Sequence, residues 1–262
     1  MLLALAQLGR GVVPADEPVL RADDDGVLRG RAVFETLRVY DGRPFELHPH
    51  FDRLKASARR LRLPEPPLAD LQSLAHDALA AANEPNCVLR FLWTPDTGLA
   101  LVSALPHELD ELRERGLRLR VCEWATGALA GAKSVSYAEN MAAQQSAVEE
   151  GLDDALFVGA DGIVLEAPTA NVWFRKGGTL YTPSLDLPIL AGVTRAVMLQ
   201  LAELPVEQGR YPLERLLAAD EVFLKSSVRE VMPVVQVGDR SFERGEAAAG
   251  LQKALRRYAG SA

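Results

Sequence analysis

The sequence predicts an α+β protein with two domains, a small α/β domain at residues 1–109 and a larger β-rich domain at residues 110–262. At 262 residues the chain is longer than one hydrophobic core usually organises. Helix and strand patterns are mixed in the first part, whereas short strands joined by tight turns dominate the second part. Between them, the segment LPHELDELRERG at 105–116 is charged and contains proline, so we expect the domain joint there.

In the first domain, strands and two helices are expected to form one α/β unit. Runs of β-forming residues bounded by turn residues predict strands over 1–8, 32–40 and 87–94. Asp41-Gly42 is a strong hairpin dipeptide and should end the second of these strands. Apolar residues at helical spacing predict a helix that begins near residue 48 and ends before the PEPP segment, and a second helix over 70–83.

The second domain is expected to be built mainly from short strands with tight turns. The predicted strands cover 117–123, 154–158, 163–166, 171–175 and 179–183. Helical patterns are found over 139–150 and 193–203, and again in the terminal LQKALRRY segment. This balance of elements predicts a β-dominated domain.

Composition excludes several classes of function. With 29 Lys and Arg against 36 Asp and Glu, the net charge of −7 would repel phosphate backbones, so nucleic acid is not an expected partner. No stretch reaches the roughly 20 apolar residues that span a bilayer, and the opening MLLALAQLG lacks the basic leader of a signal peptide. We therefore expect no membrane partner and a cytoplasmic location.

Metal and disulfide chemistry are not expected either. Cys87 and Cys122 lie far apart and form no C-x-x-C pair. His48 and His50 have no accompanying cluster of carboxylates or cysteines, so we interpret them as residues at the entry of a helix. The sequence predicts no metal site.

Lys133 is the most distinctive candidate for chemistry. The chain has five lysines against twenty-four arginines, and Lys133 alone lies among small residues, in ATGALAGAKSVSY, with no acid within five positions. A lysine in a desolvated pocket loses proton affinity and becomes a nucleophile for aldehydes. On these residues alone, an ordinary surface lysine stays the alternative.

Several motifs follow Lys133 in a characteristic order. They are Tyr137 and Asn140, the segment EAPTANVWF at 166–174, ILAGVTR at 189–195, and EVFLKSSVREVMPV at 221–234. Over about 29–233 this series resembles the fold-type-IV pyridoxal-phosphate enzymes, or class IV aminotransferases. That family includes branched-chain and D-amino-acid aminotransferases and aminodeoxychorismate lyases. The resemblance implies a pseudo-barrel second domain, pyridoxal 5'-phosphate bound in the cleft between the domains, and a homodimer.

The resemblance also implies roles for the residues that match the family motifs. Lys133 becomes the Schiff-base lysine, which also moves the substrate Cα proton. Glu166 would face the pyridine nitrogen of the cofactor and Tyr137 its ring oxygen, with an exposed carboxylate and a core tyrosine as the alternatives. The phosphate would be held by Gly192, Val193 and Thr194 at a helix start, by Ser227, and by Arg53, for which a solvent-facing helix arginine is the alternative.

Substrate choice is the finer prediction. Arg29 in LRGRAVF and Arg90 in VLRFLW are two guanidiniums that suit a carboxylate, and this pair is similar to an atypical group of D-amino-acid aminotransferases. In the family, the loop that carries Arg29 crosses into the neighbouring subunit's site. The further substrate residues implied by the resemblance are Phe34, Thr36, Val228 and Arg229, the last of which could equally face solvent.

Three activities therefore stay open, in an order of preference. Transamination between a D-amino acid such as D-alanine or D-glutamate and a 2-oxo acid such as 2-oxoglutarate is favoured by Arg29. An aminodeoxychorismate lyase, releasing pyruvate and 4-aminobenzoate, is close behind, because Thr36 and the segments at 171–186 and 209–221 look like those of such lyases. A branched-chain L-amino-acid aminotransferase is third.

Overall fold

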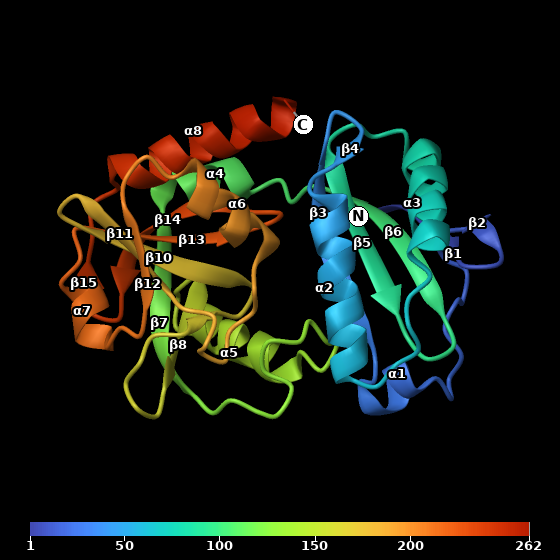
Figure 1. Ribbon diagram of the computed structural model, residues 1–262, viewed down its shortest axis with the longest axis horizontal. Coiled ribbons are helices and arrows are strands. Elements are labelled where there is room, and N and C mark those ends of the chain that lie inside the picture. Colours follow the sequence, from blue (N-terminus) through green and yellow to red (C-terminus); the bar gives the residue numbers. More distant parts are fainter. Residues whose placement is uncertain (262) are drawn as a thin grey trace. The chain divides into compact units, whose positions relative to one another are not determined.

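The protein is an α+β structure whose chain divides into two compact units. The computed structural model describes residues 1–261 (Figure 1). The first unit contains residues 1–106 and 131–136, and the second contains residues 107–130 and 137–261. The predicted boundary between 109 and 110 thus lies inside the second unit, in helix α4 (Leu109–Arg115). The sequence did not indicate that the short segment around Lys133 belongs with the first unit.

A six-stranded antiparallel sheet forms the centre of the first unit, in the order β2-β1-β6-β5-β3-β4. The strands are β1 (Leu2–Gln7), β2 (Gly11–Val13), β3 (Val33–Tyr40), β4 (Arg43–Pro44), β5 (Cys87–Trp93) and β6 (Gly98–Ala104). The predictions for β1, β3 and β5 are confirmed. Asp41 and Gly42 both have positive φ, 48° and 81°, as the predicted two-residue hairpin requires.

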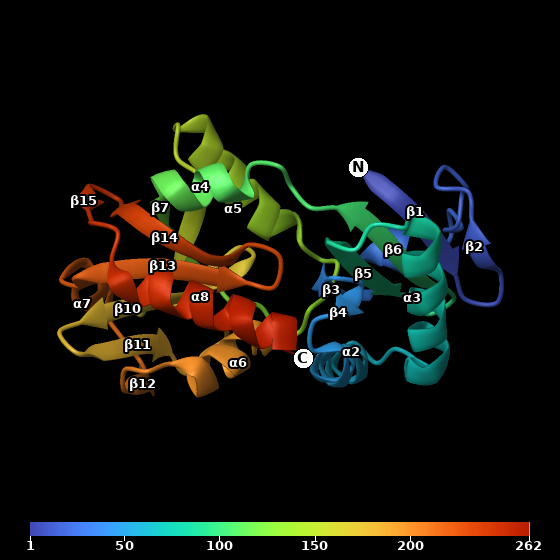
Figure 2. The ribbon, with the colours of Figure 1, turned by 90° about the horizontal axis from the view of Figure 1, so that it is seen from above.

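Two helices, α2 (Leu47–Arg60) and α3 (Leu68–Ala82), lie on one face of this sheet (Figure 2). Their apolar sides and one side of β3 form the first core, in which Leu37 and Leu54 are fully buried. Burial alternates strictly along β3, so Val33, Glu35 and Leu37 point toward this core. Phe34 and Thr36 therefore lie on the opposite, open face of the sheet. A short helix, α1 (Asp25–Arg29), precedes β3 and buries none of its residues.

The second unit contains a nine-stranded sheet with the main order β12-β11-β10-β13-β14-β7-β8, where β9 pairs with β10 and β15 pairs with β14. Its strands are β7 (Leu117–Trp124), β8 (Asp154–Gly159), β9 (Glu166–Ala167), β10 (Ala170–Lys176), β11 (Thr179–Pro183), β12 (Val206–Gly209), β13 (Glu221–Ser226), β14 (Glu230–Val237) and β15 (Arg240–Ser241). Strand β7 runs parallel to both of its neighbours, β14 and β8. The prediction of a β-dominated second domain is thus confirmed.

Five helices belong to the second unit. They are α4, α5 (Ala138–Glu149), α6 (Val193–Leu201), α7 (Leu213–Leu217) and α8 (Glu246–Ser261). Helix α5 packs on β8, and α8 packs on β14 and α6. The second core contains Phe174 and Leu224 of the strands together with Leu109 of α4 and Leu216 of α7. No helix within residues 1–261 has the length and apolar character needed to cross a membrane.

Two predictions for this unit are wrong in part. The segment 105–116, expected to be only a joint, contains helix α4. The strand expected over 163–166 is reduced to two isolated bridges, Val158 with Val164 and Ile163 with Pro212, followed by the two-residue β9. Consecutive residues here pair with different neighbours, so no continuous ladder forms.

Candidate cofactor and substrate site

Lys133 is held against strand β3 of the first unit by backbone hydrogen bonds. The amide N–H of Phe34 donates to the carbonyl oxygen of Lys133 at 3.0 Å, and Val33 forms an antiparallel bridge with Ser134. The amide N–H of Lys133 donates to Oγ of Ser57 on α2 at 3.1 Å. Its side chain lies over an aromatic ring, with Nζ 4.4 Å from the ring centre of Phe34. The amine thus has a defined position on the open face of the sheet.

Phe34, Thr36 and Arg90 form the neighbourhood of this amine. Thr36 on β3 is directly opposite Arg90 on β5, and the Arg90 Nε–H donates to Thr36 Oγ1 at 3.2 Å. The guanidinium carbon of Arg90 lies 5.6 Å from the ring centre of Phe34, the ring that Lys133 also contacts. The structure therefore brings together four of the residues predicted from the sequence.

Arg53 lies on the helix-covered side of β3, in a buried ionic cluster. Its Nε–H and Nη2–H groups donate to the two oxygens of Glu35, at 2.8 and 2.7 Å. The side chain of Arg53 is only 11% exposed, so the solvent-facing alternative is wrong. His50, one turn earlier on α2, is fully buried, and its Nδ1 is 2.7 Å from Oε2 of Glu35.

Charge in this cluster is set by burial and by Arg53. Burial by itself would raise the pKa of Glu35, but the ion pair with Arg53 and the hydrogen bond from His50 outweigh it and bring the pKa to about 2. Burial lowers the pKa of His50, and the charges of Arg53 and Lys133 act in the same direction. His50 is therefore neutral at pH 7, and its Nδ1–H donates to the Glu35 carboxylate.

Arg29 is placed differently from the group around Lys133. It lies in the last turn of α1, its side chain is 65% exposed, and its guanidinium pairs with the carboxylate of Asp25. Its ion pair lies within α1 and does not involve Phe34, Thr36 or Arg90.

Glu166 of the second unit is held by two neutral donors. Its Oε2 accepts from Nδ2 of Asn171 at 2.9 Å, and its Oε1 accepts from the amide N–H of Leu190 at 3.0 Å. Asn171 also donates to the carbonyl oxygen of Leu190 at 3.0 Å, and it is itself buried. These bonds fix the direction of a half-buried carboxylate whose chain neighbours, Leu165 and Ala167, are buried.

The beginning of helix α6 gathers hydrogen-bond donors. Gly192 is the residue that precedes the helix, and Val193 and Thr194 form its first turn, where backbone N–H groups have no partner within the helix. The hydroxyl of Thr194 is 3.3 Å from that of Ser227 in the turn after β13. A Cβ atom on Gly192 would lie 2.8 Å from Nζ of Lys225, so this buried amine borders the same helix start.

Three other predicted residues have partners within the second unit. The hydroxyl of Tyr137 donates to the carbonyl oxygen of Pro168, to which Asn140 also donates at 3.2 Å. Arg229 pairs with the fully buried Asp154 at 2.8 Å, so its solvent-facing alternative is wrong. Val228 is partly buried against the second core. Their contacts with cofactor and substrate stay predictions.

The chain matches the family model described as amino-transferase class IV over residues 32–237. It belongs to the class IV aminotransferases. The resemblance noted in the sequence is thereby confirmed, and with it the dependence on pyridoxal 5'-phosphate that characterises this family.

Relatives of this class IV enzyme are named for different activities. The chain is 32% identical to the aminodeoxychorismate lyase of Bacillus subtilis, covering 90% of this chain and 88% of that protein. It is 33% identical to a bifunctional aminodeoxychorismate lyase and D-amino acid transaminase of Mycobacterium tuberculosis, covering 71% and 73% of the two chains. These two relatives share the family and differ in the reactions for which they are named.

A solved structure supports the fold of the whole class IV chain. A hypothetical aminotransferase from Mycobacterium tuberculosis, solved in its PLP-bound form, matches with a TM-score of 0.92 at 28% identity, covering 98% of this chain and 99% of that one. The same protein has also been solved with alpha-ketoglutarate and PMP bound, and that form matches with a TM-score of 0.93.

The donor set at α6 fits the phosphate of the family's cofactor. Two hydroxyls, the open N–H groups of a helix start and the amine of Lys225 are all donors, and an anion with several acceptor oxygens satisfies such a set. Glu166 and Asn171 lie beside the same helix start, because the Cβ atom built on Gly192 would meet Oδ1 of Asn171 at 2.2 Å. Anion donors and an oriented carboxylate are thus neighbours in this class IV enzyme.

Sequence reasoning missed several members of the site. Glu35 could have been found, because it occupies an inward position of β3 between Val33 and Leu37, where a charge needs a partner. His50 precedes Leu54 by four residues on α2 and so shares its buried face, which corrects its interpretation as an entry residue. Lys225 lay in a recognised motif but had no assigned neighbour.

Proposed function

We propose that this class IV enzyme is an aminotransferase acting between a D-amino acid, such as D-alanine or D-glutamate, and a 2-oxo acid, such as 2-oxoglutarate. The observation that supports this is the position of Arg90, whose guanidinium is held by Thr36 over the ring of Phe34, the ring that Lys133 also contacts. A fixed guanidinium beside the amine suits a substrate carboxylate.

Each predicted residue takes a defined part in this proposal. Bound pyridoxal phosphate supplies an aldehyde carbon and a ring that accepts electrons. Lys133 holds that carbon through Nζ and then moves the substrate Cα proton. Glu166 keeps a proton on the pyridine nitrogen, since its carboxylate is oriented by Asn171 and Leu190. Thr194, Ser227 and the Val193 amide bind the phosphate.

Arg53, Tyr137, Val228 and Arg229 complete the proposed set. Arg53 would add a cation for the phosphate, with its guanidinium fixed by Glu35. Tyr137 would donate to the ring oxygen, and Val228 and Arg229 would border the substrate carboxylate. We further propose a cytoplasmic homodimer in which Arg29, exposed on α1, serves the site of the partner subunit.

Aminodeoxychorismate lyase is the second candidate. It is favoured by Thr36, whose hydroxyl lies on the open face of β3 beside Phe34, and by the similarity to the Bacillus subtilis lyase along most of both chains. In that case the products would be pyruvate and 4-aminobenzoate. Branched-chain L-amino-acid transamination is the third candidate.

A half-reaction scan distinguishes these activities. The purified yellow protein is mixed with single D- or L-amino acids without an acceptor, and conversion of the cofactor to its amine form is followed by absorbance. We expect conversion with D-alanine or D-glutamate and none in the Lys133→Ala variant. Pyruvate release from aminodeoxychorismate without cofactor conversion would instead establish the lyase. Conversion by L-leucine or L-valine alone would establish the branched-chain enzyme.

A further inference from the structure

Glu230 occupies a position in a hairpin where glycine is the usual residue. Strands β13 and β14 pair Ser226 with Glu230, so residues 227–229 form a three-residue loop between them. Glu230, the first residue of β14, follows this loop directly and has a left-handed φ of 57°. A residue with a Cβ atom is strained there, so its side chain must be held by contacts that compensate.

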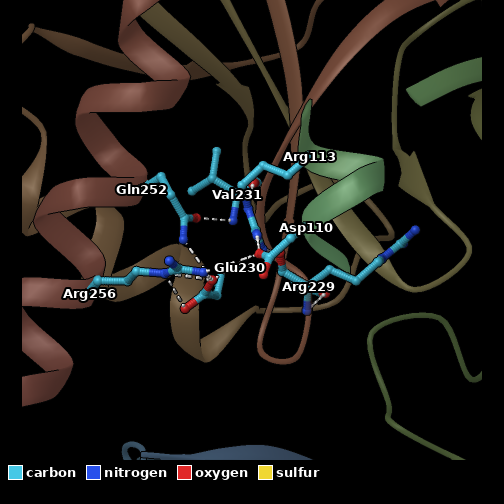
Figure 3. Close-up of polar contacts among 8 residues, drawn as sticks. Asp110, Arg113, Arg229, Glu230, Val231, Gln252 and Arg256 are labelled. Carbon is cyan, nitrogen blue, oxygen red and sulfur yellow. Dashed lines mark hydrogen bonds and ion pairs between the residues drawn. The ribbon is translucent and has the colours of Figure 1, made fainter. Parts of the chain in front are cut away.

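Those contacts come from two helices that converge on the Glu230 carboxylate (Figure 3). This side chain is fully buried. Its Oε2 accepts from Nη2 of Arg113 on α4 at 3.1 Å, and from Nε2 of Gln252 and Nη2 of Arg256 on α8 at 2.6 and 3.1 Å. Two guanidiniums and an amide therefore surround one buried charge, an arrangement that fixes its geometry.

The same two helices also bind the backbone at this point. Arg113 Nη2–H donates to the carbonyl oxygen of Arg229 at 3.0 Å, and its Nε–H donates to that of Val231 at 3.3 Å. Oε1 of Gln252 accepts from the amide N–H of Val231 at 2.9 Å. Arg229 and Val231, on both sides of Glu230, are thus bound to α4 and α8. The end of the hairpin loop at Arg229 therefore cannot shift alone.

We propose that Glu230 is a positioning residue for the cofactor phosphate. It does not touch the phosphate, but it fixes the loop that carries Ser227, whose hydroxyl lies 3.3 Å from that of Thr194. The inference rests on the proposed function, in which Ser227 and Thr194 bind the phosphate. It adds that α4 and α8, through one strained glutamate, set how tightly the phosphate is held.

The test compares pyridoxal phosphate with pyridoxal, which lacks the phosphate. Apo-protein is titrated with each compound, and binding is followed by visible absorbance. In Glu230→Ala we expect the preference for pyridoxal phosphate to fall by about tenfold or more, equivalent to the loss of one good hydrogen bond to a charged group. Pyridoxal affinity should change little, because Lys133 and Glu166 lie outside the loop.

Glu221 offers a matched control. It is also a buried glutamate that anchors α8, accepting from the amide N–H groups of Ala247 and Ala248 at 3.2 and 2.7 Å and from Arg175 at 3.2 Å. It lies at the opposite end of β13 from the loop. Glu221→Ala should lower the melting temperature and leave the preference for pyridoxal phosphate unchanged.

A double mutant tests whether Glu230 affects phosphate binding through Ser227. If Glu230 acts through Ser227, then Ser227→Ala alone lowers the preference, and adding Glu230→Ala lowers it by less than the product of the two effects. Should Glu230→Ala not fold, the same measurements are made with Glu230→Gly, which removes the side chain and suits the positive φ.

Three results would overturn the inference. They are a lower melting temperature of Glu230→Ala with an unchanged preference, independent effects of the two substitutions, and no effect of Ser227→Ala. A wild-type protein that binds both compounds equally would count against the proposed phosphate site itself, and the inference would fall with it. The wild-type titration thus reports the failure of the proposed function separately.

Discussion

At the scale of single residues, the cluster of Glu35, His50 and Arg53 shows how charge is accommodated beneath β3. One buried carboxylate receives two hydrogen bonds from a guanidinium and one from a neutral imidazole. Removing either charged partner would leave the other buried without compensation, which is strongly unfavourable. Arg53 is therefore held by Glu35 in one orientation, as its proposed contact with the phosphate requires.

This cluster predicts a stability that depends on acid. The pKa of Glu35 is about 2 in the folded protein against 4.5 ordinarily, so its contribution is complete above pH 4.5 and is lost as the pH falls toward 2. This difference in pKa corresponds to a contribution of Glu35 to the free energy of unfolding on the order of 3 kcal/mol. The pKa of His50 is lowered from 6.5, so protonation of its imidazole below pH 6.5 also reduces the stability of the folded protein.

Urea unfolding of the wild type and of Glu35→Gln between pH 7 and pH 3 measures this contribution. We expect the variant to be less stable at neutral pH, and the difference between the two proteins to shrink as the pH falls. A difference that stays constant over this range would show that Glu35 is not the titrating group.

Arg90 carries the substrate prediction at this scale. In Arg90→Gln, we expect the KM for a 2-oxo acid to rise by about tenfold to a hundredfold with a smaller change in kcat, because a charged hydrogen bond to the substrate is lost. Arg120→Gln is the control, since Arg120 is also a strand arginine but pairs with Glu150 on the surface. An unchanged KM in Arg90→Gln would remove Arg90 from the substrate site.

At the scale of elements, the start of α6 is closely packed against the neighbouring strands. Gly192 has an ordinary φ of −69°, so glycine is required here by space and not by conformation. A Cβ atom would lie 2.2 Å from Oδ1 of Asn171, which in turn orients Glu166. The start of α6, Asn171 on β10 and the carboxylate of Glu166 are thus in close contact at Gly192.

Gly192→Ala should therefore weaken cofactor binding by about tenfold or more, since displacing Asn171 costs a buried hydrogen bond. Gly178→Ala serves as the control, because a Cβ atom there meets nothing within 4 Å. The measurement is the apparent dissociation constant for pyridoxal phosphate, followed by absorbance, in Gly192→Ala and in Gly178→Ala. Equal affinity of the two variants would mean that the start of α6 lies outside the cofactor site.

Elements with strong local patterns could be predicted from the sequence, and those defined by their neighbours could not. Strand β3 and helix α2 have clear periodicity and match their predicted ranges closely. Helix α4 is short and highly charged, so its pattern resembles that of a linker. The segment 163–165 looked like a strand, but its pairing is divided between Val158 and Pro212.

In the candidate site, too, some residues could be predicted from local sequence and others could not. The motifs indicated Lys133, Glu166, Thr194 and Ser227, because the resemblance assigns roles by sequence position. Their supporting partners, Glu35 and Glu230 among them, depend on contacts between segments far apart in the chain. Glu230 and Gln252, for example, meet only because α8 packs on β14.

At the scale of the whole molecule, the chain distributes the proposed chemistry over both units. Lys133 belongs to the first unit through the short segment 131–136, whereas Glu166, Thr194 and Ser227 belong to the second. The proposed dimer adds Arg29 as a residue acting in the partner subunit, which accounts for its exposed position on α1.

The dimer proposal predicts complementation between two inactive variants. Lys133→Ala lacks the amine and Arg29→Ala lacks the guanidinium, so each homodimer should be impaired. After the two are unfolded together and refolded, mixed dimers contain one site with both residues, and we expect activity to be regained. No gain above the separate variants, with dimers confirmed by sedimentation, would show that Arg29 does not act across the dimer.

The central claim is that Lys133 is the lysine that carries the cofactor, and reductive trapping tests it most directly. The yellow protein is treated with borohydride, which makes the bond between cofactor and lysine permanent, and the labelled peptide is identified by mass spectrometry. The account predicts the label on Lys133 and on none of the other four lysines. A label on Lys225, the buried amine beside Gly192, or no label at all would contradict it.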